Sequence, residues 1–200
     1  MTDKATIANL ALQLLGQIPN IVDLDSDNTQ RARDLRNAYE PARLAALRAH
    51  AWNFATVRDT LAATATTPAW GYAKRYALPP DYVGQLRFSK DHHGSRKPPH
   101  RIVTDRNQSG TFIDTDEGSP IYVEWVSNVT NTALFDPMFV EYFAAKLAEK
   151  VAFQVTGKAN LAPEMRDYAA DLARDARWAD AVDTGRDEPD EGEFLAARAI

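Results

Sequence analysis

The chain has 200 residues, of which 44% are hydrophobic, with 23 Lys and Arg, 28 Asp and Glu and no cysteine. This length can bury a core without disulfides or a structural metal, and the lack of cysteine excludes a disulfide scaffold, a thiol nucleophile and a cysteine zinc site. A net charge of −5 provides no basic field for DNA phosphates, which argues against a dedicated duplex-DNA reader.

The first residues, Met1-Thr2-Asp3-Lys4, do not form a basic stretch that leads into an unbroken apolar run, so we expect no secretion signal. Polar residues interrupt every apolar stretch well before the roughly 20 residues that cross a bilayer. The sequence therefore predicts a soluble product with no membrane partner.

Residues 1–51 contain two helical patterns. Asp3 or Thr2 can cap the first and Gly16 can end it, and its apolar residues recur at helical spacing: Ile7, Leu10, Ala11, Leu14 and Leu15. Asp27 is the predicted N-cap of the second, whose stripe is Leu35, Tyr39, Ala42 and Ala46. Pro41 either bends one long helix or begins a new one.

Residues 52–132 are richer in Thr, Val and aromatic residues and are punctuated by Gly and Pro, which predicts a β-rich insertion. The clearest strand covers 121–126, where Ile121, Val123 and Trp125 share one face. Shorter candidate strands are 54–61, 75–78, 82–88, 100–104 and 111–114.

Residues 133–182 return to helix. Asp136 as N-cap, Pro137 at the first helical position and Gly157 after the last turn define one helix, and Pro163 opens another. These patterns predict an α+β fold: a four-helix antiparallel bundle of two N-terminal and two C-terminal helices, with the β-rich insertion projecting from it.

Large apolar residues identify the expected structural core: Trp52, Phe54, Phe139, Phe143 and Leu147. The aromatic residues that follow the second helix are expected to seal the junction between the bundle and the β module rather than to bind a ligand. This set is Trp52, Phe54, Trp70, Tyr72 and Tyr76.

Two clusters of polar residues are candidates for a metal site or a catalytic site. His92, His93 and His100 can be imagined around a metal, but the neighbouring Lys and Arg side chains repel cations. The carboxylates at 114, 116 and 117 lie beside Gly118, where such residues shape a turn. We therefore expect no catalytic residue, no metal and no cofactor.

Charge is distributed unevenly along the chain. Arginines of the second helical region are candidates for a subunit interface: Arg31, Arg36, Arg43 and Arg48. Residues 183–200 are acidic and rich in Gly and Pro, which predicts an extended, mobile tail. Its last residues form an apolar patch suited to binding a partner: Phe194, Leu195, Arg198 and Ile200.

Five motifs, in this order and at these separations, carry a resemblance to a known family. They are Ile7-Ala8-Asn9-Leu10-Ala11-Leu12, Tyr39-Glu40-Pro41-Ala42-Arg43, Trp52-Asn53-Phe54-Ala55, Tyr76-Ala77-Leu78-Pro79-Pro80-Asp81 and Phe135-Asp136-Pro137-Met138-Phe139. Together the chain resembles the tail tubular protein A family, the head-to-tail adaptors of short-tailed bacteriophages. The segment 90–101, with its basic residues and histidines, has no role that the resemblance supplies.

The resemblance implies a structural virion protein that is not an enzyme. Its partners would be the portal protein, a tail nozzle similar to tail tubular protein B, and further copies of itself in a ring of twelve subunits. Genomic DNA would pass through this ring during ejection without sequence-specific binding. The protein would be located in the connector of the virion, and in the host cytoplasm during assembly.

Three alternatives stay open. An adaptor or head-completion protein of a long-tailed phage or gene transfer agent would have similar helices and a different neighbour below the ring. A virion-associated polysaccharide-degrading enzyme would need the carboxylates of Asp114, Asp116 and Glu117. A regulator that binds DNA through the arginine-rich helix predicts steeply salt-dependent binding.

Overall fold

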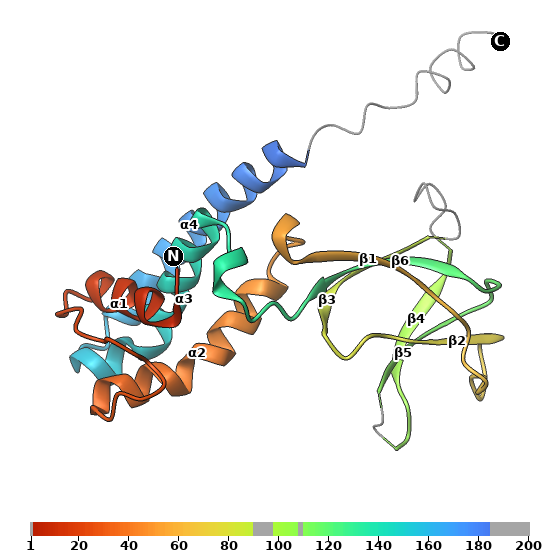
Figure 1. Cartoon of the computed structure of the whole chain (residues 1–200), viewed down its shortest axis with the longest axis horizontal. Helices are drawn as coiled ribbons and strands as arrows, with labels where there is room; N and C mark the ends of the chain where they lie inside the picture. Colours follow the sequence, from red (N-terminus) through yellow and green to blue (C-terminus); the bar gives the residue numbers. More distant parts are fainter. Residues whose placement is uncertain (1, 90–97, 108–109, 185–200) are drawn as a thin grey trace, which may run out of the picture.

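The computed structural model describes residues 2–89, 98–107 and 110–184. The described part contains four α-helices: α1 (Lys4–Leu14), α2 (Gln30–Arg48), α3 (Pro137–Thr156) and α4 (Leu161–Asp183). It also contains six strands: β1 (Thr56–Leu61), β2 (Lys74–Ala77), β3 (Tyr82–Ser89), β4 (His100–Thr104), β5 (Thr111–Thr115) and β6 (Ile121–Ser127). The helices lie at one end of an elongated molecule and the strands at the other (Figure 1).

The caps of α3 are those that the sequence predicts. The Asp136 carboxylate accepts the backbone N–H groups of Met138 and Phe139 at 2.8 and 3.3 Å, which satisfies two of the donors left free at a helix start. Gly157 ends the helix in the left-handed conformation, at φ 71°, where a Cβ would be strained.

The start of α2 differs from the prediction. Thr29 caps the helix by accepting the N–H of Ala32, whereas Asp27 lies two residues earlier and accepts the N–H of Thr29. Pro41 lies inside one continuous helix of 19 residues, which decides between the two readings of that proline.

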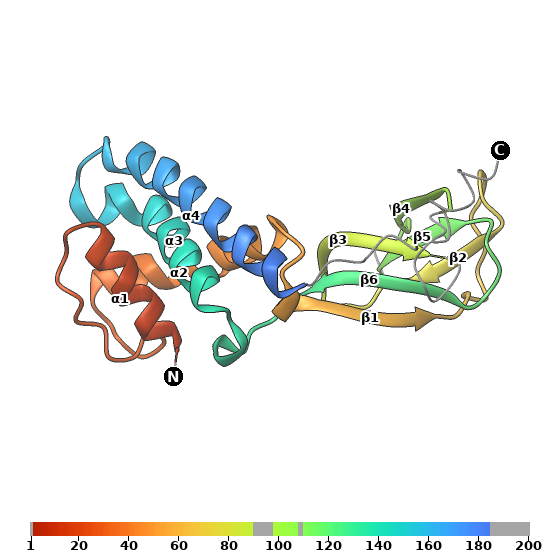
Figure 2. The ribbon, with the colours of Figure 1, turned by 90° about the horizontal axis from the view of Figure 1, so that it is seen from above.

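The predicted α+β class is correct, but the four-helix antiparallel bundle is wrong. The extensive helix–helix contacts all involve α3, against which α1, α2 and α4 each pack (Figure 2). The reason lies in what each helix can bury. α4 buries only Ala169, Ala173 and Ala176, a stripe too narrow to cover two neighbours. Residues outside the helices, Trp52, Ala55 and Val126, complete this core instead.

The strands form two three-stranded antiparallel sheets, in the orders β1-β6-β3 and β2-β5-β4. Their facing sides enclose a second, smaller core that includes Tyr76, Phe88, Ile113, Val123 and Trp125, as in a β-sandwich. Trp125 belongs to this core, whereas the next residue, Val126, belongs to the helical core. β6 therefore contributes to both cores through alternate faces of one strand.

Candidate functional site

Arg43 is the main polar connection between α2 and the segment that follows β6. Its guanidinium donates to the Val129 carbonyl at 2.6 Å, to Asn128 Oδ1 at 2.7 Å and to the Glu40 carboxylate at 2.6 Å. The side chain is only 2% exposed. A buried guanidinium needs such partners, so Arg43, predicted from the sequence as a subunit-interface residue, joins α2 to the segment after β6 within the chain.

Arg48 lies at the same junction but on the surface. Its Nη1 donates to the Val83 carbonyl at 2.7 Å, and its own carbonyl accepts from Gln85 Nε2 at 3.1 Å. Among the described residues, Arg48 forms no ion pair with a carboxylate. Its positive charge is therefore available to a partner.

Beside Arg48, α2 and the start of β3 border a groove of about 440 Å³. We call it the junction groove, and its lining is mostly apolar: Leu44, Ala45, Arg48, Pro80, Tyr82, Val83 and Asn128. Burial raises the pKa of Tyr82, an effect that the nearby Arg48 opposes. The groove thus combines apolar walls with one unpaired cation.

Arg31 and Arg36 fasten the segment between α1 and α2. Arg36 donates to the carbonyls of Leu24 and Asp27 at 2.8 and 2.6 Å, and Arg31 makes longer bonds, of 3.4 Å, to Ile18 and Gln17. Both arginines are half-buried. The segment that they hold leaves two apolar side chains in solvent, Ile18 and Val22.

The C-terminal half of α4 is attached to the end of α2 by one carboxylate. Asp180 accepts the backbone N–H of Asn53 at 2.9 Å, and its other oxygen lies 3.1 Å from His50 Nε2. Arg177 adds a bond to the Ala49 carbonyl at 3.2 Å. The helix is thereby held with Trp178 and Val182 pointing to solvent, 73% and 61% exposed.

These two residues are the functional candidates that sequence reasoning missed. They lie away from the buried residues Ala169, Ala173 and Ala176 of α4, four residues apart, on the side that carries Asp171 and Asp175. We call this set, Asp171, Asp175, Trp178 and Val182, the α4 outer face. The signal was present in the sequence as a large aromatic residue outside the buried stripe.

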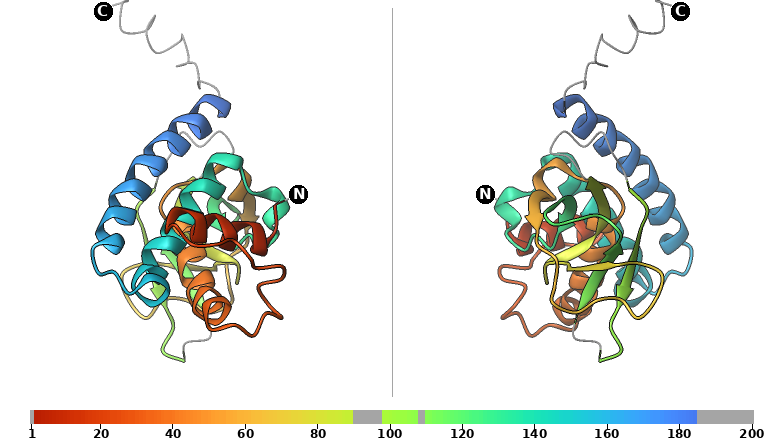
Figure 3. Two further views of the ribbon diagram at one scale, coloured as in Figure 1. Left: turned by 90° about the vertical axis from the view of Figure 1, so that its left-hand side faces the viewer. Right: turned by 90° about the vertical axis from the view of Figure 1, so that its right-hand side faces the viewer.

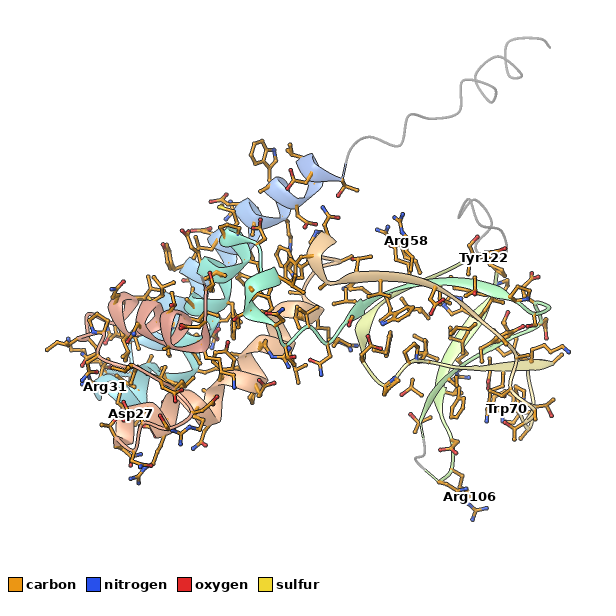
Figure 4. The ribbon with its side chains drawn as sticks, viewed as in Figure 1. Asp27, Arg31, Arg58, Trp70, Arg106 and Tyr122 are labelled. Atoms are coloured by element: carbon orange, nitrogen blue, oxygen red, sulfur yellow. The ribbon has the colours of Figure 1, made fainter. Side chains whose placement is uncertain are left out.

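A second hollow, of about 450 Å³, lies on the outer side of the β2-β5-β4 sheet. Trp70, Tyr72, Arg101 and Ile102 are among its lining residues, with the ion pair of Arg75 and Asp114 at its base. Figure 4 places Trp70 at the end of the molecule farthest from the helices. Its indole is 78% exposed.

The residues of the acidic cluster at 114, 116 and 117 make separate structural hydrogen bonds. Asp114 accepts two bonds from Arg75, at 2.7 and 2.8 Å, a bidentate geometry that neutralises both groups. That contact raises the pKa of Arg75. Asp116 accepts the N–H of Ala73 at 2.9 Å, and the carbonyl of Glu117 accepts the Tyr76 hydroxyl at 2.8 Å.

The predicted aromatic junction set does not form one cluster. Trp52 and Phe54 stack with each other and contact Phe139 in the helical core. Tyr76 is buried in the sandwich core, and Trp70 is exposed at the far end. Only Trp52 and Phe54 lie at the predicted junction. The other three residues lie elsewhere because β1 and the loop after it extend away from the helices. The other predicted core residues, Phe143 and Leu147, are fully buried on α3.

His92 and His93, and the tail residues Phe194, Leu195, Arg198 and Ile200, lie outside the described residues. His100 is described, with its ring against Phe88 and its Nδ1 3.1 Å from the Pro98 carbonyl. Within residues 2–89, 98–107 and 110–184, no three His, Asp or Glu side chains gather as metal ligands would. None of the helices in these ranges combines the length and hydropathy of a bilayer-crossing segment.

Comparisons with known proteins add no family. No protein-family model matches the chain, and no curated protein matches it significantly.

Proposed function

We propose that the chain is a structural protein of a bacteriophage virion, a head-to-tail adaptor that assembles as a ring of twelve subunits between the portal and the tail nozzle. The resemblance of its motifs to the tail tubular protein A family motivates the proposal. One structural observation supports it further: the described part of the chain exposes apolar side chains on separate surfaces, among them Trp178 and Val182 on α4 and Ile18 and Val22 between α1 and α2.

A ring is built from repeated contacts in which one surface of a subunit meets a different surface of the next. Such a subunit needs two complementary surfaces that do not overlap. Here the α4 outer face lies on one side of the helical part, and the segment between α1 and α2 lies on the other (Figure 3). The junction groove supplies a third apolar surface, bordered by α2 and β3.

An adaptor must also keep its two ends in a fixed relation when neighbours attach above and below. Asp180 connects the helical part to the segment before β1, and Arg43 connects it to the segment after β6. β6 shares its side chains between both cores. These contacts favour one rigid body over two parts on a hinge.

Attachment to the portal is assigned to the tail, through Phe194, Leu195, Arg198 and Ile200, with the acidic stretch before them as a tether. The neighbour below the ring is not specified by these residues, so an adaptor of a long-tailed phage or gene transfer agent is the alternative within the same class.

The enzyme alternative receives less support, because a polysaccharide hydrolase of the usual type needs two available carboxyl groups. Both Asp114 oxygens accept from Arg75, and Asp116 accepts the backbone N–H of Ala73. The enzyme alternative has a direct test. The variant with Asp114→Asn, Asp116→Asn and Glu117→Gln should change no sugar release from host polysaccharide, whereas loss of a measurable activity would support the enzyme.

The proposal is tested by co-sedimentation of the purified chain with its cognate portal. The full chain should sediment with the portal, and a chain ending at residue 184 should keep its helical content but bind much more weakly. Equal binding by both chains would contradict the role of the tail, and no binding by the full chain would contradict the adaptor.

A further inference from the structure

The α4 outer face and the junction groove have properties that match. One is a convex helix side with a large indole and a branched aliphatic side chain in solvent. The other is a groove of about 440 Å³ with Leu44, Tyr82 and Val83 in its walls. An exposed apolar projection and an apolar recess on the same chain allow copies to join head to tail.

The two surfaces lie at the same level of the long axis. α2 separates them: its end, at Ala49 and His50, contacts α4, whereas Leu44 and Arg48 border the groove. Figures 1 and 2 show the C-terminal turns of α4 and the start of β3 both at the junction between helices and strands. A neighbour placed beside the molecule, with its long axis parallel, can present one surface to the other without sliding along the axis.

Position and charge select the groove over the two other exposed apolar patches. The second hollow, which includes Trp70, lies at the end of the molecule farthest from the helices and so not at the level of α4. The described part of α4 from 167 to 183 contains five Asp and two Arg, and Arg174 is already paired with Asp171. The junction groove offers the unpaired cation of Arg48. The segment that carries Ile18 and Val22 has a mixed set of charges, because Asp23, Asp25 and Asp27 lie beside Lys4, Arg31 and Arg36. The lining of the junction groove has a cation and no carboxylate, which suits an acidic helix better.

We propose that the α4 outer face of one copy docks into the junction groove of the next, with the Trp178 indole between Leu44 and Tyr82 and the α4 carboxylates near Arg48. The occupant of the groove is thus a second copy of this chain. This inference rests on the proposed ring, for which it names the contact between subunits. Trp and Arg at the centre of such a contact typically dominate its energy.

Because the chain has no cysteine, engineered cysteines report this contact without background. The double variant Leu44→Cys with Val182→Cys should give a ladder of disulfide-linked multimers when the full-length protein is oxidised, both at high concentration alone and in the presence of its cognate portal. A mixture of the two single variants should stop at dimers, and each single variant alone should stay monomeric. Cross-linking of Val182→Cys with itself would mean a two-fold symmetric contact and would overturn the proposal.

Three controls make the result specific. The pair Val22→Cys with Val182→Cys should give no ladder, although position 22 is more exposed than position 44. In the double-cysteine background, Trp178→Ala should lower the multimer yield at least about tenfold, and Phe153→Ala, which removes another exposed aromatic side chain, should leave it unchanged. An unchanged yield with Trp178→Ala, or equal cross-linking through position 22, would contradict the assigned contact.

The double-cysteine variant also tests whether the C-terminal tail of the chain, rather than a second copy, occupies the groove. We expect a chain that ends at residue 184 to give the same yield of multimers as the full chain. A lower or higher yield would mean that residues 185–200 occupy the groove, and it would overturn the proposal. Failure of the proposal and failure of the adaptor function are distinguishable. Rings on the portal without the 44–182 cross-link refute the contact alone, and the cross-link without portal binding refutes the function alone.

Discussion

The helical part and the β-sandwich are stabilised in different ways. The helical core gathers seven aromatic side chains, with contacting ring centroids 4.8 to 6.4 Å apart: Tyr39, Trp52, Phe54, Phe135, Phe139, Tyr142 and Phe143. The sandwich core is smaller, and its outer faces carry rows of charge across three strands, such as Arg58, Glu124 and Arg87. We therefore expect apolar packing to dominate the stability of the helical part, and polar pairs to contribute a larger share in the sandwich with its smaller core.

Removing one aromatic side chain should therefore have the largest effect. Trp52 is almost fully buried, donates its indole N–H to the Ala46 carbonyl at 3.0 Å and contacts four other rings. Trp52→Ala should lower the free energy of unfolding by about 3–5 kcal/mol, measured by urea denaturation. The exposed Trp70→Ala is the matched control and should change stability little. Equal effects of the two would mean that the helical core is not the dominant source of stability.

Breaking the polar link between the two parts should have the next largest effect. Arg43→Met leaves the Val129 carbonyl and Asn128 Oδ1 without their donor, at a cost of about 2–3 kcal/mol. It should also separate unfolding into two transitions, one for each part, in calorimetry. Arg36→Met, which removes an arginine of the same helix from a loop contact, should keep a single transition. A single transition in both variants would show that the shared strand β6 couples the parts without Arg43.

Removing the ion pair between Arg75 and Asp114 should lower stability less than the two changes above, and only in the β-sandwich. Arg75→Met leaves the Asp114 carboxylate without its bidentate partner while that carboxylate stays buried. We expect a loss of about 1–2 kcal/mol, seen as faster amide hydrogen exchange in β2, β4 and β5 and no change in α3. Faster exchange throughout the chain would contradict separate stabilisation of the two parts.

The smallest effect is a pH dependence that belongs to the helical part. Burial acts to raise the pKa of Glu149, but its bonds to Lys146 and Arg166 outweigh this and lower the pKa below its usual value. Because the folded-state pKa is the lower one, the contribution is present above the unfolded pKa of about 4.3 and is lost as the pH falls through the folded value.

Glu149→Gln should therefore remove part of the acid destabilisation between about pH 5 and pH 3, at a cost of about 0.5 kcal/mol at pH 7. Melting curves across this range provide the measurement. Glu141→Gln on the same helix serves as the control. A parallel shift of both variants at every pH would exclude the Glu149 contacts as the source.

The sequence predicted local structure better than packing. The caps of α3 and the strand at 121–126 follow from residue types whose preferences act over a few residues, such as Asp136, Pro137 and Gly157. The bundle failed because periodicity shows that a helix has an apolar side but not how much that side can cover. The three buried alanines of α4 illustrate this limit.

The candidate surfaces show the same limit. Arg43 and Arg48 are five residues apart on one helix, yet one is buried and the other borders a groove. The position of each arginine side chain depends on its hydrogen-bond partners, Asn128 and Val129 for Arg43 and Val83 for Arg48. These partners lie 35 to 86 residues away in the sequence. Only the exposure of Trp178 could have been anticipated, from its place outside the buried stripe.

The most direct test of the account is electron microscopy of the purified full-length protein with and without its cognate portal. Subunits alone can be monomers, because ring contacts can be weak until a neighbouring assembly concentrates them. We predict closed rings of twelve subunits on the portal, with the helical and β parts at different heights along the ring axis. Subunits that stay monomeric in the presence of the portal would contradict the central claim.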